Sequence, residues 1–273
     1  MNMVTAFAIL CVLALIGLPG LGAQFEPHFL HPTYAQAPAL FLEEVVAGSP
    51  AAKAGLVRGD YVTTANGTPM TDDAMLRNFT KDHAGRDVTL HVRSKTGERD
   101  VTVKLNSSVS KVGFLGVGTQ AVYKLRYSPG EAVVAAGYIT GALFVATIVG
   151  VLGLLIHIPA LILGLFAKSI PAAAATASGP VGIIYILQSL TSIGYSYIFL
   201  FMANIAVALA AFNVLPLPAL DGGRLAIITI QKVTKRRIDA DTEAKIHAFG
   251  FMALIGLMLV ITVYDVRKIF FHV

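Results

Sequence analysis

Hydrophobic and polar positions are distributed very unevenly along this chain. Residues 40–111 hold 19 of the 37 charged side chains, whereas residues 131–230 hold only four. In the first block, apolar and polar residues alternate as in short strands. In the second, apolar residues are almost continuous, and such a segment is stable only in lipid or against other apolar helices. The pattern therefore predicts a water-exposed domain followed by a membrane-embedded one.

The chain begins with another apolar stretch, residues 3–18, which Pro19-Gly20 ends. Its sixteen residues are slightly short of the roughly 20 that cross a bilayer as a helix. A secretory signal peptide is the competing interpretation, but no Lys or Arg precedes the apolar run. We therefore predict a transmembrane helix over residues 1–19 and a proline-containing connector over residues 20–39.

Residues 40–106 have the pattern of a small soluble domain. The alternation predicts strands over residues 41–46, 61–65, 88–92 and 100–105, and helices over residues 49–56 and 71–83. Ser49 would cap the first of these helices, and Asn66-Gly67 is a tight-turn dipeptide. Residues 48–67 closely resemble the signature of bacterial PDZ domains. Their sequence is Gly-Ser-Pro-Ala-Ala-Lys-Ala-Gly-Leu-Val-Arg-Gly-Asp-Tyr-Val-Thr-Thr-Ala-Asn-Gly. We therefore expect an α+β PDZ-like domain here.

The PDZ resemblance implies that the domain binds peptides. PDZ domains add an extended peptide to a strand edge and often hold its C-terminal carboxylate. The groove strand is expected near Leu40, Phe41 and Leu42, while no carboxylate-binding loop is recognisable. Residues 107–130 are then interpreted as a linker that leaves the domain.

Four apolar segments follow within residues 131–273. They are residues 132–166, 181–212, 219–231 and 248–264. The basic run at residues 232–237 predicts that the loop 232–247 is cytoplasmic. If the PDZ-like domain lies outside the cytoplasm, an odd number of crossings must separate it from that loop. Because Pro159 interrupts the first segment, we predict that 132–166 is interfacial or re-entrant.

Composition supports the membrane location and excludes other classes of protein. Hydrophobic residues make up 55% of the chain and charged residues 14%, against roughly 25% charged in a soluble domain. Basic loops explain the net charge of +5 better than a nucleic-acid partner does. The single cysteine, Cys11, excludes an intrachain disulfide and a thiolate zinc cluster. The predicted fold is a polytopic α-helical membrane protein with one inserted α+β domain.

Candidate chemistry is concentrated in residues 213–224, Asn-Val-Leu-Pro-Leu-Pro-Ala-Leu-Asp-Gly-Gly-Arg. Pro216 and Pro218 remove backbone donors and interrupt helix. At membrane depth such a break is tolerated only inside protein or beside a wet cavity. Asp221 follows, and an ionisable residue there is costly unless it is paired or bound to a metal. An ordinary loop at the end of a span, with Asp221 solvated, would explain the same pattern.

This stretch resembles the second sequence motif of the site-2 protease family, the intramembrane zinc metalloproteases. That motif combines an Asn with a following Pro-x-Pro and Leu-Asp-Gly. Gly179-Pro180 resembles the turn by which the family's chain enters its catalytic core, and residues 247–268 resemble its last helix. A PDZ domain inserted before the core is typical of the bacterial branch. The resemblance therefore extends over nearly the whole chain.

The resemblance implies a role for each part of the motif. Asp221 would be a zinc ligand beside two imidazoles and a water. Asn213 would donate its amide to the substrate backbone or to a developing oxyanion. The two prolines would hold the unwound geometry, and Gly222 and Gly223 would let the next helix restart against its neighbour.

One part of the family pattern is missing. His-Glu-x-x-His, which supplies two zinc ligands and the general base, does not occur in this sequence. The histidines present are His28, His31, His83, His91, His157, His247 and His272. We therefore expect Zn²⁺ in the complete enzyme but not tightly held by this chain alone. The favoured explanation is an N-terminally truncated, inactive chain, and the alternative is a non-catalytic homologue.

Three classes of function fit these observations. The first is an intramembrane zinc endopeptidase of the bacterial inner membrane, which cleaves transmembrane segments of single-span proteins and has an extracytoplasmic PDZ-like domain. The second is a non-catalytic membrane protein that binds peptides through that domain. The third is a channel or transporter, which is disfavoured because the sequence has no repeated pair of broken helices. The expected partners are single-span substrates, a peptide and the lipid bilayer, with no nucleic acid.

Overall fold

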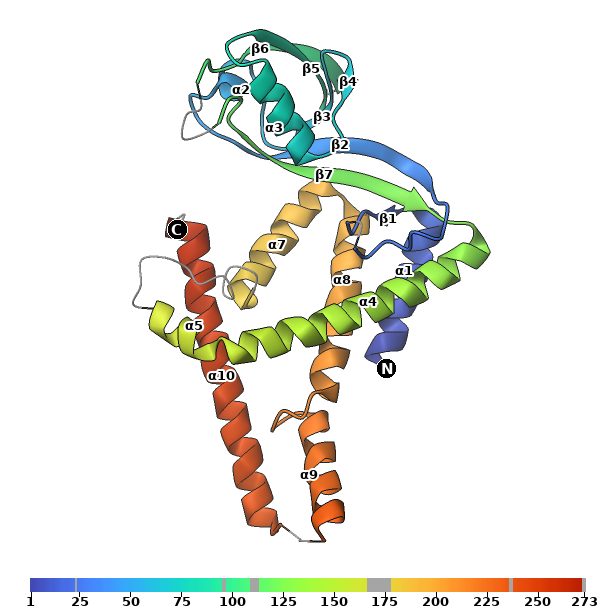
Figure 1. Ribbon diagram of the computed structural model, residues 1–273, viewed down its shortest axis with the longest axis vertical. Coiled ribbons are helices and arrows are strands. Elements are labelled where there is room, and N and C mark those ends of the chain that lie inside the picture. Colours follow the sequence, from blue (N-terminus) through green and yellow to red (C-terminus); the bar gives the residue numbers. More distant parts are fainter. Residues whose placement is uncertain (23, 95–96, 109–112, 166–177, 236–237, 272–273) are drawn as a thin grey trace. The chain divides into compact units, whose positions relative to one another are not determined.

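The computed structural model describes residues 1–22, 24–94, 97–108, 113–165, 178–235 and 238–271. The chain divides into two compact units. A helical unit comprises Met1–Cys11, Ala136–Leu190 and Ile198–Val273, and a sheet unit comprises Val12–Ala135 and Thr191–Tyr197. The predicted combination of apolar helices with a sheet-containing region is therefore confirmed (Figure 1), while the PDZ assignment stays a prediction.

The sheet unit is built on one antiparallel sheet (Figure 1). Its strands are β1 (Leu18–Pro19), β2 (Thr33–Val45), β3 (Tyr61–Ala65), β4 (Thr68–Pro69), β5 (Asp87–Ser94), β6 (Gly97–Lys104) and β7 (Val117–Arg126). They follow the order β1-β7-β2-β3-β5-β6, with β4 paired to β3. Strand β2 therefore has a neighbour along each edge.

Several local features of this unit agree with the sequence patterns. The Ser49 hydroxyl accepts a hydrogen bond from the Ala52 N–H at 3.2 Å and caps helix α2 (Pro50–Lys53). Asp72 caps helix α3 (Asp73–Asp82) in the same way. Asn66 and Gly67 both have positive φ, at 48° and 78°, as the predicted tight turn requires. The predicted Ser49 cap and the predicted turn are confirmed, and the Asp72 cap is a finding of the structure.

The assignment of the peptide groove to Leu40, Phe41 and Leu42 is wrong. Each of these side chains is at most 1% exposed, and Leu40 and Leu42 belong to the hydrophobic core of the sheet unit. Their strand, β2, pairs with β7 on one edge and β3 on the other. These residues therefore offer neither side chains nor a free strand edge to a peptide.

Both segments predicted as connectors contain strand. Strand β2 begins at Thr33, inside the predicted connector 20–39, and all of β7 lies inside the predicted linker 107–130. The reason is pairing at long range, since β2 and β7 are opposite each other from Thr33/Arg126 to Val45/Val117. The predicted helix over residues 1–19 also ends at Ile16, and Leu18–Pro19 forms β1 beside β7.

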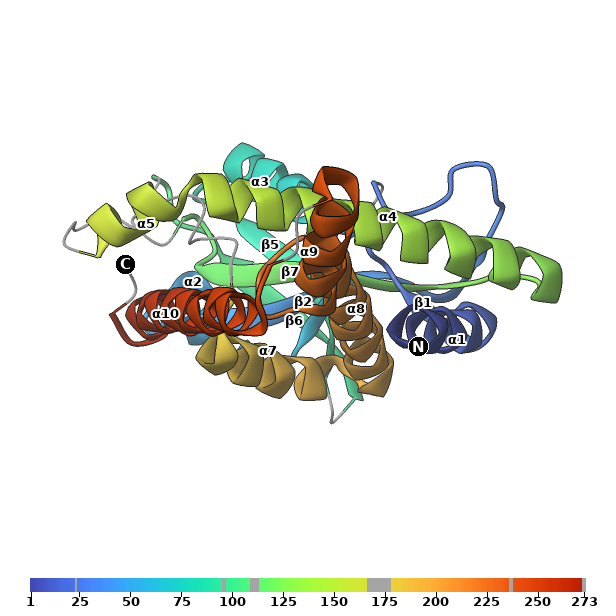
Figure 2. The ribbon, with the colours of Figure 1, turned by 90° about the horizontal axis from the view of Figure 1, so that it is seen from below.

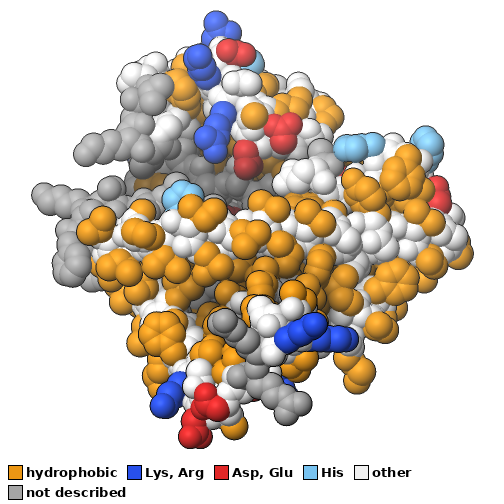
Figure 3. Space-filling model, turned by 60° about the horizontal axis from the view of Figure 1, so that its bottom comes forward, with side chains coloured by type: hydrophobic (Ala, Val, Ile, Leu, Met, Phe, Trp, Pro, Cys, Tyr) orange, Lys and Arg blue, Asp and Glu red, His pale blue; other side chains and the backbone are white. Residues whose placement is uncertain are grey.

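The other helices consist mostly of apolar residues and differ in length. They are α1 (Asn2–Ile16), α4 (Pro129–Ile156), α5 (Ile158–Gly164), α7 (Pro180–Ile193), α8 (Tyr195–Val214), α9 (Asp221–Thr234) and α10 (Ala240–Phe271). Of the helices in the described residues, three are long and apolar enough to cross a membrane: α4, α8 and most of α10. Hydrophobic side chains cover much of the helical surface, as an integral membrane protein requires (Figure 3).

Two of the predicted apolar segments have a different helical structure. Residues 181–212 are not one span, because Gly194 with φ of +136° separates α7 from α8. Within 132–166, helix α4 is continuous for 28 residues, about 42 Å at 1.5 Å per residue, and α5 begins just before Pro159. That length is sufficient for a crossing, and the re-entrant arrangement stays a prediction.

Candidate functional site

The Asn213–Asp221 segment is a short break between two helices. Helix α8 ends at Val214, just after Asn213, and α9 begins at Asp221. Pro216 and Pro218 have no N–H to donate, so the helical bonding pattern cannot continue through them. Both Asn213 and Asp221 are exposed. A carboxylate at the first position of α9 also interacts favourably with the positive end of the helix dipole.

The two glycines after Asp221 allow the end of one helix to touch the start of the next. A Cβ on Gly222 would lie 2.3 Å from the Leu215 carbonyl oxygen, and a Cβ on Gly223 would lie 2.1 Å from the Leu217 carbonyl oxygen. Any side chain would force the backbones apart. The Gly-Gly pair therefore allows the first turn of α9 to pack directly against the backbone of residues 215–217.

Ala219 is strained in this loop. Its φ is +80°, a left-handed conformation that costs an L-residue about 1–2 kcal/mol. Its N–H donates to Nδ1 of His247 on α10 at 3.0 Å. The bond is partly buried, and an intramolecular hydrogen bond contributes about 0.5–1.5 kcal/mol net, so this single bond offsets much of the strain.

Gly179-Pro180 opens helix α7, and a buried carboxylate caps it. Asp265 of α10 is 2% exposed, and its Oδ2 accepts hydrogen bonds from the N–H groups of Gly179 and Gly182, each at 2.8 Å. Both ribbon views show α7 beside α10 (Figures 1 and 2). The sequence analysis included Asp265 in residues 247–268, the predicted last helix, without giving it a role, although a carboxylate among apolar residues signals a buried partner.

Comparison with known proteins identifies the family. Residues 1–257 match Peptidase family M50. The chain belongs to this family. M50 peptidases are the site-2 proteases, so the predicted resemblance is confirmed.

The M50 relatives are larger proteins. Zinc metalloprotease RasP of Geobacillus kaustophilus is 31% identical over 220 residues, which is 80% of this chain and 48% of the relative. Regulator of sigma-W protease RasP of Bacillus subtilis is 29% identical over 275 residues, covering 99% of this chain and 57% of the relative. Regulator of sigma-E protease RseP of Escherichia coli is 27% identical over 253 residues, covering 89% and 50%. The chain spans about half the length of the curated relatives it matches.

The described part of this M50 chain does not bring together a three-ligand zinc site. Among the described residues, no three His, Cys, Asp or Glu side chains lie close enough to share a metal ion. A catalytic zinc needs three protein ligands and an open position. Asp221 alone does not provide that set, and no catalytic step through zinc follows from the residues described.

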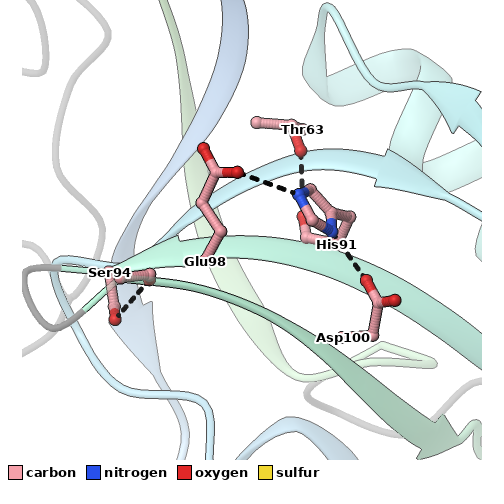
Figure 4. Close-up of polar contacts among 6 residues, drawn as sticks. Thr63, His91, Ser94, Glu98 and Asp100 are labelled. Atoms are coloured by element: carbon pink, nitrogen blue, oxygen red, sulfur yellow. Dashed lines mark hydrogen bonds and ion pairs between the residues drawn. The ribbon is translucent and has the colours of Figure 1, made fainter.

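The histidines have other contacts. Nδ1 of His83 is 2.9 Å from the Phe79 carbonyl oxygen, and Nδ1 of His157 is 2.7 Å from that of Gly153. His272 lies outside the described residues. On the β5–β6 hairpin, His91 has Asp100 at 2.6 Å from Nδ1 and Glu98 at 3.5 Å from Nε2 (Figure 4). The carboxylates face opposite ring nitrogens, so the three groups cannot surround one ion.

The sheet unit contains a pocket of about 230 Å³ between α3 and the start of β7. Its lining includes Leu76, Arg77 and Thr80 from α3 together with residues 113–119. The Thr119 hydroxyl donates to the Asp73 carboxylate at 2.7 Å and links the two walls. Sequence reasoning missed this pocket because it assigned residues 107–130 to a linker. The glycines at 113, 116 and 118 were the available signal.

Proposed function

We propose that this chain carries part of the active site of an intramembrane zinc endopeptidase that cleaves membrane-spanning segments of single-span proteins. The observation that carries the proposal is the position of Asp221. It lies at the start of α9, exposed, after a proline-broken loop between apolar helices of an M50 chain. A non-helical backbone segment between membrane helices has free backbone groups to which an extended substrate can bind.

The residues present account for part of the reaction. The exposed Asn213 amide donates a hydrogen bond to the substrate backbone and stabilises charge that develops on the scissile carbonyl oxygen. Asp221 would supply one carboxylate ligand for a zinc ion, and the chemistry that such an ion would supply is polarisation of the carbonyl and activation of water. Two further ligands and a general base are required, and neither the sequence nor the described structure provides a His-Glu-x-x-His for them.

The test uses this chain joined to the His-Glu-x-x-His helix of a relative, with a single-span reporter substrate in membranes. Asp221→Asn should abolish cleavage, because it removes the negative charge while keeping size and hydrogen bonding. Asn213→Ala should slow cleavage by about 10²–10³-fold, the usual cost of one oxyanion donor. Asp239→Asn is the matched control, because Asp239 caps α10 through Thr242 and should leave cleavage unchanged. Full activity in Asp221→Asn would refute the proposal.

A second candidate function, peptide binding without cleavage, is favoured by the pocket between α3 and β7. One edge of β7 pairs with β2. On the other edge, the strand pairing seen in the described residues is that of β1 with Lys124 and Leu125. The edge beside the pocket therefore accepts an extended peptide by strand addition. Arg77 at the pocket is exposed and would favour an acidic side chain or a C-terminal carboxylate.

Peptide binding is tested on the whole chain in detergent, with a fluorescent hydrophobic peptide that ends in a free carboxylate. Arg77→Glu should weaken binding at least tenfold, and amidation of the peptide C-terminus should have a similar effect. Lys53→Glu, on a different concave surface of the sheet unit, serves as control. Equal affinity for all three proteins would exclude this site.

We further propose that the protein lies in the inner membrane of a bacterium, with the sheet unit outside the cytoplasm and residues 232–247 inside. The predicted loop 232–247 is largely helical, because it contains the end of α9 and the start of α10. The basic run Lys232-Val233-Thr234-Lys235-Arg236-Arg237 supports this orientation, because Lys and Arg concentrate in cytoplasmic loops. Binding of a partly trimmed substrate to the sheet unit would then precede cleavage in the membrane.

A further inference from the structure

The loop that ends at Asp221 depends on a side chain from another helix. The N–H of Ala219 donates to Nδ1 of His247, 3.0 Å away on α10. Ala219 has a positive φ of +80°. This backbone conformation is neither right-handed helical nor extended, so the residue does not join the hydrogen bonding of an adjacent helix or strand. The hydrogen bond to His247 therefore stabilises the conformation that this residue adopts.

The same face of α10 contacts the loop a second time. Gly250 follows His247 by three residues and so lies on the same side of the helix. A Cβ on Gly250 would lie 2.3 Å from Cβ of Pro218 and 2.7 Å from its carbonyl oxygen. Helix α10 thus contacts two consecutive loop residues, one by close packing and one by a directed hydrogen bond. Two contacts fix both the position and the orientation of the loop.

The direction of the hydrogen bond specifies the state of the imidazole. Nδ1 accepts a hydrogen bond from the Ala219 N–H, so the ring carries its own proton on Nε2. Nε2 lies 4.0 Å from Oε1 of Glu243, one turn earlier on α10. An asparagine would place its Oδ1 acceptor near the position of Nδ1, whereas a leucine of similar size has no acceptor. His247→Asn therefore keeps the hydrogen-bond acceptor, whereas His247→Leu keeps the packing and removes the acceptor.

We propose that His247 is a positioning residue for Asp221. It holds Ala219 in the left-handed conformation and thereby fixes the point at which α9 begins, two residues later. The inference rests on the proposed function only for its consequence in cleavage, because the contact between His247 and the loop exists whatever the site does.

The first test measures order in the loop without any cleavage assay. Cys11 is the single cysteine of the chain, so Cys11→Ser with Leu220→Cys gives one thiol reporter beside Asp221. In the full chain in detergent, His247→Leu should raise the rate of maleimide labelling about fivefold, the effect of losing one hydrogen bond of about 1 kcal/mol. His247→Asn should stay within about twofold of the parent, because it restores the acceptor.

A second measurement reports the imidazole directly. In the full chain with ¹⁵N-labelled histidine, the resonances lost in His247→Asn should be those of a neutral ring protonated on Nε2. A ring protonated on Nδ1 would overturn the proposal, because that nitrogen would then be unable to accept from Ala219. Slow labelling in His247→Leu together with fast labelling in His247→Asn would also overturn it, since packing alone would explain the contact.

Cleavage then distinguishes this inference from the proposed function. With the His-Glu-x-x-His helix supplied, His247→Leu should lower kcat and His247→Asn should recover most of it. If Asp221→Asn cleaves normally while the labelling and ¹⁵N results hold, the proposed function fails and the positioning contact stands. If Asp221→Asn is inactive while His247→Leu labels slowly and cleaves normally, the positioning role fails and the proposed function stands.

Discussion

At the scale of single residues, the least expected feature is the buried carboxylate of Asp265. Burying a charge is costly unless polar partners replace its water. Two backbone N–H groups at the start of α7 do so here, each at 2.8 Å. A helix N-terminus leaves such N–H groups without intrahelical partners. The same two hydrogen bonds therefore satisfy the donors of α7 and stabilise the buried carboxylate of α10.

Asp265→Asn should therefore destabilise the helical unit. The amide retains one acceptor oxygen but carries no charge, and its NH₂ group adds donors where only acceptors are needed. We expect a loss of about 1–3 kcal/mol, the range for a disrupted buried polar contact, visible as a lower melting temperature in detergent. Asp241→Asn, an exposed position on the same helix, is the control. Equal melting of all three proteins would contradict a capping role.

His91 provides a pH-dependent contribution to stability on the β5–β6 hairpin. Hydrogen bonding to Asp100, directly opposite on β6, raises the pKa of His91 in the folded protein. Its stabilising contribution is therefore complete below the ordinary histidine pKa of about 6.5 and is lost as the pH rises through the raised value. The difference in melting temperature between the parent and His91→Gln should be larger at about pH 5.5 than at about pH 8.5. A difference that does not change with pH would contradict this linkage.

At the scale of elements, the sequence predicts those caps, turns and hairpins that depend on residues close together in the chain. The Ser49 and Asp72 caps, the Asn66-Gly67 turn and the β5–β6 hairpin depend on residues a few positions apart. In the site, the Pro-x-Pro break and the restart at Asp221 are also local, and both could be predicted.

Elements that depend on distant partners could not be predicted in the same way. Residues 117–126 show little alternation and become strand because β2 lies beside them. His247 appears in the sequence as one histidine in an apolar helix, and only the fold brings it to Ala219. Local sequence was sufficient to propose Asp221 as a site residue, but the contacts that hold its loop come from α10.

The pairing of β2 with β7 changes the boundaries of any stable fragment. Residues 40–106 lack β7 and Leu115, a member of the buried core, as well as Val117 and Ala121 packed against it. A fragment of residues 33–126 should therefore melt cooperatively, whereas residues 40–106 should melt without a sharp transition or aggregate. Circular dichroism of both fragments tests this. A cooperative melt of the shorter fragment at the same temperature would contradict a structural role for β7.

At the scale of the whole molecule, the proposed orientation puts the sheet unit and the basic run at residues 232–237 on opposite sides of the membrane. In the Cys11→Ser background, Asn78→Cys reports on the sheet unit. Thr242→Cys reports on the first turn of α10, a few residues after the basic run; both positions are exposed. In intact spheroplasts, an impermeant maleimide should label position 78, whereas position 242 should react only after permeabilisation. The positive-inside rule gives this expectation. Labelling of both positions from the same side would contradict the proposed orientation.

The ribbon formed by β2 and β7 also bears on how such a protein gains or loses a module. Leu40 and Ala121 are opposite each other in the ribbon, so their Cα atoms are separated by one cross-strand distance, about 4.5–5.5 Å. A two-residue hairpin turn spans the same gap. Residues 41–120 therefore leave the ribbon and return to it at nearly the same point. A short turn in their place would keep the register in which Lys124 and Leu125 pair with β1. The length of the inserted part could thus change without changing the chain's path into α4.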